Sequence, residues 1–288
     1  MKIAFFGLPL AGCLLVEDGH EIVLAALSRP GVPGRRRLRR KIGAERVLDK
    51  PNLDSAFVER LTRLAPDLVV SWFWVSKIPA AVVASAKLGG FGVHPSLLPR
   101  HRGPDPTSWA IFSGDAVTGV TAHRIAAEYD TGAILASRAL AIDARWNAWQ
   151  LARALDRPSL GLLRETMRAF ATGAPPPDVA QDETLATEAP FFDDEACVIR
   201  WHLLAGEILR KIRALAPAPG ASMEVRDQVL SVLQARAIDS PSVLEEPGES
   251  IVLRGRVLVR CADGAIEILE AEHAGKALSG PALADLFA

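Results

Sequence analysis

The sequence lacks the features that identify several broad classes of protein. It has only three cysteines in 288 residues, Cys13, Cys197 and Cys261, and they lie far apart. This number and spacing match neither a disulfide framework nor a metal-binding motif, and they indicate reduced thiols, as in a cytoplasmic protein. No apolar run approaches the roughly 20 residues that a membrane-spanning helix needs, so we expect no membrane association.

Net charge is also small, because 33 Lys and Arg residues against 34 Asp and Glu residues give −1. This balance argues against a generally basic nucleic-acid coat and leaves room for a local basic patch. The sequence contains neither G-x-G-x-x-G nor a Walker loop, and the turn Gly7-Leu8-Pro9 supplies a single glycine. The absence of both glycine-rich fingerprints argues against a nicotinamide or ATP enzyme.

The residues that are present predict an α/β fold. Hydrophobic residues make up 49% of the chain, enough to fill one large or two medium domains. Apolar, strand-like segments at 3–6, 21–26 and 68–74 alternate with helical patterns at 53–64 and 79–86. Such alternation predicts parallel βαβ units, which bind ligands beyond the carboxyl ends of their strands.

The composition changes in the second half. Helical patterning runs over 147–171, with an interruption or kink expected near Pro158. The proline run 175–177 and the polar stretch 181–188 indicate a linker. A helix is expected from the acidic residues 193–195 to Pro217, followed by strands at 250–253, 257–261 and 265–269. We therefore predict a first domain over 1–171, a linker over 172–191 and a small β-domain, compatible with a barrel, over 192–288.

Residues 88–135 carry most of the candidate chemistry. His94 follows a glycine-rich strand end and is followed by two prolines that fix the backbone around it. Asp130 comes 36 residues later, within the turn Tyr129-Asp130-Thr131-Gly132. A carboxylate beside an imidazole can orient the ring and stabilise its charged form, which makes a proton-handling pair. Spacing alone does not establish this pair, because such separations occur by chance.

Three runs in this stretch resemble the 10-formyltetrahydrofolate-dependent formyltransferases: H-P-S-L-L-P-x-x-R-G, W-A-I-x-x-G-D-x-x-T-G-V-T and D-T-G-x-I-L. The segments 181–190 and 212–221 extend the resemblance to the methionyl-tRNA formyltransferases. The resemblance implies a Rossmann-like domain followed by a small OB-like barrel. It also implies 10-formyltetrahydrofolate as formyl donor, no metal, and a primary amine as acceptor, most simply that of methionyl-tRNA.

The resemblance implies roles for individual residues. His94 stands at the catalytic histidine and Asp130 at the catalytic aspartate of such enzymes, where the pair helps to remove the proton of the attacking amine. The loop along the folate would be Ser96, Leu97, Leu98 and Pro99. The pterin would be bordered by Trp72, Phe73 and Trp74, although such aromatic residues also simply fill cores.

One position departs from the family pattern. The family has Asn-x-His, with the Asn amide directed at the formyl oxygen, and this chain has Gly92 at that position. Loss of one such donor in comparable enzymes costs about 10²–10³ in rate. Three outcomes are open: another donor substitutes, with His101, Arg102 and Ser96 as candidates; the acyl group or amine differs in shape; or the site is slow or inactive.

Two further features concern the acceptor. Asp105, at the expected mouth of the site, either binds the substrate's ammonium group or is a solvated loop acid. Arg102 is a second candidate for substrate binding. Residues 35–41 read RRRLRRK, and this cationic loop corresponds to one that enters the tRNA acceptor stem in the family. The cations are Arg35, Arg36, Arg37, Arg39, Arg40 and Lys41. The alternative for the segment is a solvated helix face.

Three functions follow from these observations. The first is formyl transfer to methionyl-tRNA or to a small or carrier-bound amine. The second is RNA or carrier binding by a catalytically weakened relative. The third is hydrolysis of the formyl donor. The sequence does not fix the oligomeric state, and a monomer is the simplest expectation.

Overall fold

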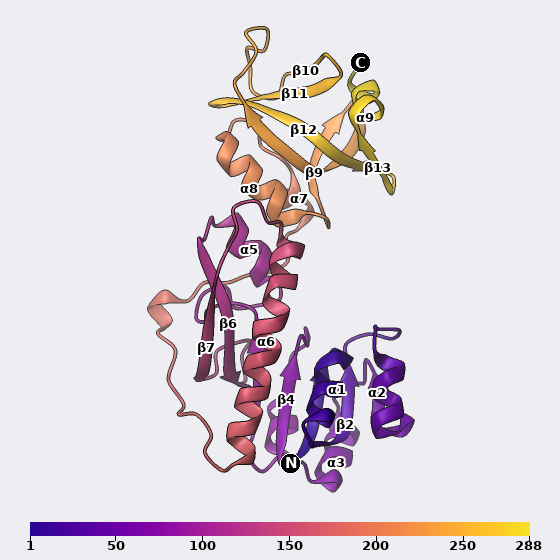
Figure 1. Cartoon of the computed structure of the whole chain (residues 1–288), viewed down its shortest axis with the longest axis vertical. Helices are drawn as coiled ribbons and strands as arrows, with labels where there is room; N and C mark the ends of the chain where they lie inside the picture. Colours follow the sequence, from indigo (N-terminus) through magenta and orange to yellow (C-terminus); the bar gives the residue numbers. More distant parts are fainter. The chain divides into compact units, whose positions relative to one another are not determined.

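The computed structural model describes all 288 residues, and the chain forms two compact units (Figure 1). The first unit comprises Met1–Pro104, Thr118–Leu140 and Ala154–Ala189. The second comprises Asp105–Val117, Ala141–Arg153 and Pro190–Ala288. The units are therefore not contiguous in sequence, and the domain bounds 1–171, 172–191 and 192–288 stay a prediction.

The first unit is built on a seven-stranded sheet with the order β3-β2-β1-β4-β5-β6-β7. The first five strands are parallel, and β6 is antiparallel to β5. Their long apolar runs are buried on both faces, as expected for parallel strands covered by helices. The strands are β1 (Lys2–Gly7), β2 (Glu21–Leu27), β3 (Val47–Asp49), β4 (Leu68–Trp72), β5 (Gly90–His94), β6 (Val117–Arg124) and β7 (Ile134–Ala141).

Helices cover both faces of this sheet. On one face, α3 contributes Phe57 and Leu61 to a core that also contains Val69 of β4. On the other face, the ring of Phe170 in α6 stacks on Phe91 of β5, with 5.6 Å between centroids. The helices are α1 (Pro9–Glu17), α2 (Arg35–Ile42), the short η1 (Ala44–Arg46), α3 (Ser55–Leu64), α4 (Ala80–Ala84), α6 (Ala148–Ala171) and η2 (Glu183–Leu185).

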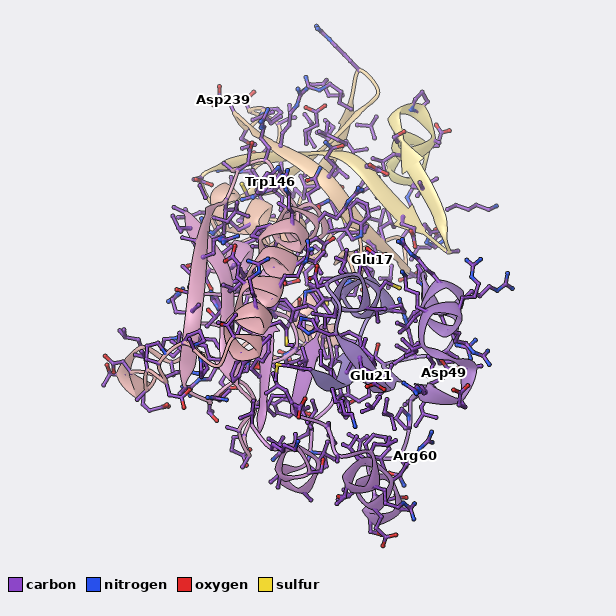
Figure 2. The ribbon with its side chains drawn as sticks, turned by 60° about the horizontal axis from the view of Figure 1, so that its bottom comes forward. Glu17, Glu21, Asp49, Arg60, Trp146 and Asp239 are labelled. Atoms are coloured by element: carbon purple, nitrogen blue, oxygen red, sulfur yellow. The ribbon has the colours of Figure 1, made fainter.

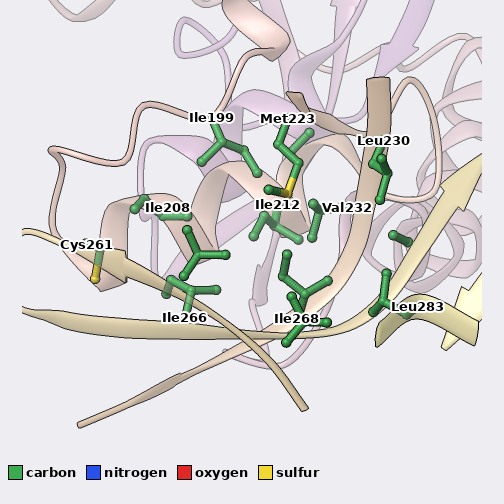
Figure 3. Packing of buried hydrophobic residues seen from close by; sticks show 14 of the residues in the cluster. Ile199, Ile208, Ile212, Met223, Leu230, Val232, Cys261, Ile266, Ile268 and Leu283 are labelled. Carbon is green, nitrogen blue, oxygen red and sulfur yellow. The ribbon is translucent and has the colours of Figure 1, made fainter. Parts of the chain in front are cut away.

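The second unit contains a six-stranded antiparallel sheet with the order β10-β11-β12-β9-β8, in which β13 also pairs with β12. Ile208 and Ile212 of one helix lie in a core with Ile266 and Ile268 of the sheet (Figure 3). Its elements are α5 (Pro106–Phe112), α7 (Asp194–Cys197), α8 (Ala205–Leu215), β8 (Ala221–Val225), β9 (Gln228–Ile238), β10 (Ser250–Leu253), β11 (Arg256–Cys261), β12 (Gly264–His273), β13 (Lys276–Ser279) and α9 (Gly280–Phe287).

The predicted fold class is confirmed: a mostly parallel, Rossmann-like sheet with helices is followed by an antiparallel β-unit. One local expectation was wrong in part and another was wrong. The α6 helix continues through Pro158 without the interruption expected there, and a kink stays a prediction. The single helix expected over 193–217 is two helices, because the chain is extended at Val198 and the Ile199 amide bonds the Ser222 carbonyl instead of a helical partner. None of the helices combines the length and the apolar character that crossing a bilayer requires.

Candidate active site at the end of strand β5

The register of three neighbouring strands sets the candidate site. Gly92 of β5 pairs with Ser71 of β4 and, on its other side, with His123 of β6. His94, the last residue of β5, pairs with Thr121 in the same way. Because side chains alternate along a strand, positions 92 and 94 face the same side of the sheet, together with the residues paired to them. The site is therefore assembled on one face at the carboxyl end of β5.

His94 is buried and held by the backbone. Its Nε2 lies 2.8 Å from the carbonyl oxygen of His101. Because a carbonyl oxygen can only accept, we assign the proton of the neutral ring to Nε2. The other ring nitrogen, Nδ1, faces Asp130, with 3.4 Å to Oδ2. The structure thus brings together the histidine and the carboxylate that the sequence paired.

Asp130 is fixed by the turn that carries it. Its Oδ2 accepts a hydrogen bond of 2.9 Å from the Gly103 amide, and its carbonyl oxygen accepts one of 2.7 Å from Gln181 Nε2. Asp130 has a φ of 55°, a left-handed conformation that aspartate tolerates better than most residues. At Gly132 a Cβ would lie 1.8 Å from the Arg124 carbonyl oxygen, so only glycine allows the turn to approach β6 this closely.

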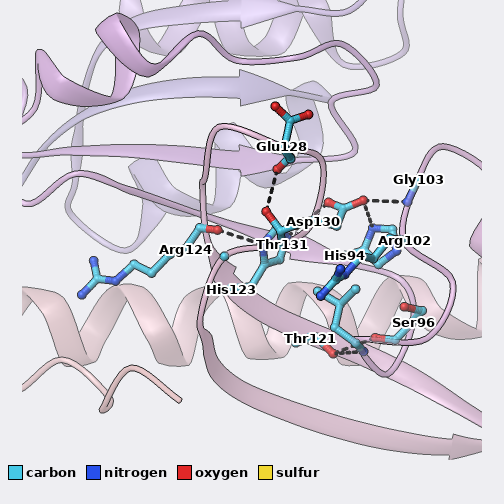
Figure 4. Close-up of polar contacts among 12 residues, drawn as sticks. His94, Ser96, Arg102, Gly103, Thr121, His123, Arg124, Glu128, Asp130 and Thr131 are labelled. Carbon is cyan, nitrogen blue, oxygen red and sulfur yellow. Dashed lines mark hydrogen bonds and ion pairs between the residues drawn. The ribbon is translucent and has the colours of Figure 1, made fainter. Parts of the chain in front are cut away.

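A second histidine faces the same carboxylate from the other side (Figure 4). His123 is buried, and its Nε2 lies 3.5 Å from Asp130 Oδ1. Its Nδ1 lies 2.9 Å from the Arg124 carbonyl oxygen. Burial lowers the pKa of His123 to about 4, although the charge of Asp130 acts in the opposite direction. The sequence analysis did not identify this residue. It could have been found only from the pairing of its strand with the strand that carries His94.

The loop expected along the folate is held by internal hydrogen bonds. Ser96 is fully buried, and its hydroxyl donates to the Arg100 carbonyl at 2.6 Å. Thr121 Oγ1 donates to the Ser96 carbonyl and accepts from the Leu98 amide. Leu98 is buried, whereas Leu97 and Pro99 are half-buried. Contact between this loop and a folate stays a prediction.

Arg102 has a different place from the one expected. It is 5% exposed, and its guanidinium makes two hydrogen bonds of 2.8 Å to Glu183 and two to Gln181 Oε1. The Glu183 carboxylate raises the pKa of Arg102 further. Arg102 therefore binds residues of the segment that was expected to be a linker. Contact between Arg102 and a substrate stays a prediction.

The three aromatic residues at the end of β4, Trp72, Phe73 and Trp74, do not share one environment. Trp72 is buried toward α6, where its Nε1 donates 2.7 Å to Ser159 Oγ, so it lies on the face opposite Gly92. Trp74 packs against Phe6 at 5.4 Å between centroids, in the core with α3. Phe73 is half-buried at the strand end. Trp72 thus has a packing role, and contact of all three with a pterin stays a prediction.

Asp105 precedes α5 and belongs to the second unit. Burial raises the pKa of its carboxyl group, whereas hydrogen bonds from Ser108 lower it. A partly buried acid that contacts its own helix differs from the solvated loop acid considered above. Its role in binding an ammonium group stays a prediction.

The cationic segment is the helix α2, and only part of its charge is free. Arg35 binds Asp49 through Nε at 2.7 Å, while Arg37 and Lys41 both contact Glu17, at 2.8 and 3.1 Å. Figure 2 labels both carboxylates beside this helix. Leu38 is fully buried and anchors the helix, and Arg39 is half-buried. The exposed and unpaired cations are Arg36 and Arg40.

These residues define what the arrangement can do chemically. Two imidazoles, those of His94 and His123, face one carboxylate, so the cluster can accept and return a proton. No group of three or more His, Cys, Asp or Glu side chains is placed to hold a metal ion. Proton transfer is the chemistry that the side chains of His94, Asp130 and His123 offer.

Comparison with known proteins places this geometry in context. Residues 14–165 match the family described as "Formyl transferase", and residues 192–285 match "Formyl transferase, C-terminal domain". The chain is 34% identical over 292 positions to a methionyl-tRNA formyltransferase of Herpetosiphon aurantiacus, covering 96% of this chain and 94% of that protein. A protein of the same name from Pelobacter propionicus is 33% identical, with coverage of 96% and 89%.

Solved structures share the fold at lower identity. HypX from Aquifex aeolicus in complex with tetrahydrofolic acid matches with a TM-score of 0.69 and 23% identity, over 97% of this chain and 46% of HypX. WlaRD, a sugar 3N-formyl transferase, matches with a TM-score of 0.68 and 15% identity, over 96% and 98%. At these identities the likeness establishes the fold alone.

Proposed function

Because the chain belongs to the formyl transferase family, we propose that it transfers a formyl group from 10-formyltetrahydrofolate to the amino group of methionyl-tRNA. The observation that carries the transfer is the pair of His94 and Asp130, 3.4 Å apart at the carboxyl end of β5. Ligands of doubly wound sheets bind at this edge. The relatives named above support methionyl-tRNA as the acceptor, since they match almost the whole chain.

The residues present fit a formyl group. Gly92 has no side chain, and a Cβ there would meet Ser71 Cβ at 3.4 Å and His123 Nε2 at 3.7 Å, both ordinary contacts. The strand thus leaves at least the room of a methyl group beside the His123 ring. When bound, 10-formyltetrahydrofolate supplies an activated acyl carbon.

The protein's own part is to position groups and move a proton. His94 is oriented by the His101 carbonyl on one side and by Asp130 on the other. An amine that attacks a carbonyl carbon must lose a proton, and one of the two imidazoles that face Asp130 can accept it. Burial of these groups excludes water, which strengthens their electrostatic interactions.

Helix α2 supports a nucleic-acid acceptor. Its unpaired Arg36 and Arg40 are one helical turn apart and exposed, so both can contact phosphates at once. Arg35 is instead bound to Asp49 and serves the fold.

The test is a transfer assay with the purified protein, 10-formyltetrahydrofolate and three acceptors: methionyl-tRNA, free methionine and an amino sugar nucleotide. We expect tetrahydrofolate release that depends on methionyl-tRNA, with formyl-methionine found on the tRNA. Transfer only to a small amine would overturn the acceptor while keeping the reaction class. Equal release without any amine would indicate hydrolysis, and no release would contradict the transfer itself.

A further inference from the structure

Gly92 and His123 form a cross-strand pair. Gly92 has no side chain, and the His123 ring lies beside the space that a side chain at position 92 would occupy. They lie directly opposite each other in the antiparallel ladder of β5 and β6. The ring nitrogen of His123 is one of the atoms nearest to a Cβ built at position 92, at 3.7 Å. Two polar atoms lie 3.7 Å from that position, His123 Nε2 and the Ser71 carbonyl oxygen, and of the two only the ring nitrogen belongs to a titratable side chain.

Hydrogen-bond roles determine what this nitrogen can do. The Arg124 carbonyl can only accept, so the proton of the neutral ring lies on Nδ1, at 2.9 Å from that oxygen. Nε2 then carries a lone pair and can accept a proton but not donate one. His94 Nδ1 lies near the other oxygen of Asp130, so the carboxylate stands between the two rings.

The charged and titratable groups around His123 are consistent with a neutral resting ring. Asp130 favours the charged ring, whereas His94 and Arg102 disfavour it. The flanking Arg124 side chain is directed to Asp178, with 2.7 Å between Nε and Oδ1, and only its carbonyl meets the ring.

We propose that His123 Nε2 accepts the proton of the attacking amine and returns it to the departing folate nitrogen. This inference rests on the function proposed above and adds a residue to its site. Two of the alternative donors considered from the sequence are already engaged: the Ser96 hydroxyl binds the Arg100 carbonyl, and the Arg102 guanidinium binds Glu183 and Gln181.

The transfer balances with one proton in transit. A bond forms between the amine nitrogen and the formyl carbon, and the bond between that carbon and N10 of the folate breaks. The amine loses one proton to Nε2, and N10 takes up one proton as its bond breaks. His123 is therefore neutral before and after each turnover, and Asp130 stabilises the imidazolium between the two transfers.

The first test does not depend on turnover. Nitrogen-15 NMR of labelled histidines in the whole protein reports the tautomer of each ring. We expect His123 to be neutral at pH 7 with its proton on Nδ1, and His94 to carry its proton on Nε2; His123→Asn and His94→Asn assign the signals. A proton on Nε2 of His123, or a charged ring in the free enzyme, would overturn the proposal.

The second test separates proton transfer from hydrogen bonding. In His123→Asn the amide can still donate to the Arg124 carbonyl, whereas in His123→Gln it reaches toward the position of Nε2; neither side chain can take up a proton. We expect kcat to fall on the order of 10²–10⁴-fold in both variants. Activity retained in His123→Gln would indicate a hydrogen-bonding role, and activity retained in both would indicate no role; either result contradicts the proposal.

Controls make these outcomes specific to the site. His273→Asn is the matched change, because His273 Nδ1 also lies near a backbone carbonyl, that of Val229 at 3.2 Å, but in the second unit. It should keep wild-type kcat. Binding of 5-formyltetrahydrofolate, followed by tryptophan fluorescence, should differ less than about threefold between wild type and both His123 variants. Wild-type protein that formylates no amine would contradict the proposed function. The NMR test would still decide whether the His123 ring is neutral with its proton on Nδ1, because it does not depend on turnover.

Discussion

The Gly103 amide donates a hydrogen bond of 2.9 Å to Oδ2 of Asp130, the same oxygen that lies 3.4 Å from His94 Nδ1. The loop after His94 therefore reaches across to hold the carboxylate that faces His94. Oδ1 is left for His123. Each oxygen of Asp130 thus has its own histidine, and one backbone amide fixes the orientation of the carboxylate between them.

Asp130→Asn tests the charge of this carboxylate. Asparagine tolerates the left-handed φ of 55°, so the turn should keep its shape. The amide cannot stabilise an imidazolium, and we expect kcat to fall on the order of 10²–10⁴-fold, measured by tetrahydrofolate release.

The control for Asp130→Asn is Asp178→Asn, which removes an equally charged but half-exposed carboxylate from Arg124. It should leave kcat within about twofold of the wild type. A large loss of thermal stability in Asp130→Asn would show that the residue acts by stabilising the fold, and not through its charge in the site.

Gln181 is the second residue to test. Its Nε2 lies 2.7 Å from the carbonyl oxygens of both Asp130 and Gly132, and its Oε1 accepts from Arg102. Gln181→Ala should destabilise the protein by about 1–3 kcal/mol, because partly buried polar groups lose their partners. It should also lower kcat by loosening the Asp130 turn. Chemical unfolding and the transfer assay measure the two effects, and Gln228→Ala, at an exposed position, is the control.

Gln181 also shows where sequence reasoning reached its limit. The parallel strands and the pairing of His94 with Asp130 could be predicted, because apolar runs and a specific motif are local properties of the sequence. Composition assigned Gln181 to a linker, since polar and proline-rich residues surround it. The tertiary contacts with Arg102 and the Asp130 turn give the segment its order, and no local pattern reports them.

The same limit explains the other differences. His123 has no motif of its own, and it reaches Asp130 only because β6 runs antiparallel to β5 with Gly92 opposite. The run of cations in α2 indicated either a nucleic-acid contact or a solvated helix face, and the sequence did not show which cations are paired. The fold places Asp49 and Glu17 beside it, so charge counting overestimated the cations available to a ligand.

A third prediction concerns these cations. Replacing Arg36 and Arg40 together by Ala should weaken tRNA binding and reduce the slope of log K against log salt by about one for each phosphate that the helix no longer neutralises. Arg35→Ala should instead lower stability, because it leaves Asp49 without its partner. Binding measured over a series of salt concentrations, with thermal unfolding of each variant, separates the two roles.

Releasing cations should have the opposite effect. Glu17→Gln frees Arg37 and Lys41, and we expect tighter tRNA binding with a steeper salt slope. Unchanged affinity and slope in both Glu17→Gln and the Arg36 and Arg40 double variant would exclude α2 as a phosphate-binding surface.

A fourth prediction concerns the face of the sheet away from the site. Trp72 Nε1 donates to Ser159 Oγ at 2.7 Å, and both residues are buried. Ser159→Ala would leave the indole N–H without a partner, which costs about 1–3 kcal/mol of unfolding free energy. Urea unfolding followed by tryptophan fluorescence measures this loss, with the exposed Ser76→Ala as control. Equal stability of the two variants would show that the hydrogen bond contributes nothing measurable.

The last prediction concerns the pH dependence of the antiparallel unit. Glu267 of β12 is buried, and its carboxylate accepts hydrogen bonds from Arg256 and Arg236 at 2.9 and 2.7 Å. The Arg256 hydrogen bond, with that of Arg236, holds the pKa of Glu267 at about 2, against an ordinary value of 4.5. A carboxyl group with a lowered pKa contributes stability that is complete above its unfolded pKa and is lost as the pH falls toward its folded pKa.

Glu267→Gln should therefore cost about 1–2 kcal/mol at pH 6, a value discounted because both arginines are half-exposed. The difference from the wild type should shrink between pH 4.5 and pH 2. Unfolding of this unit, followed by circular dichroism across that range, measures it. Glu272→Gln removes the same charge from an exposed position of β12 and should show no such convergence. A constant difference between Glu267→Gln and wild type down to pH 2 would mean that packing of the side chain, and not its charge, stabilises the sheet.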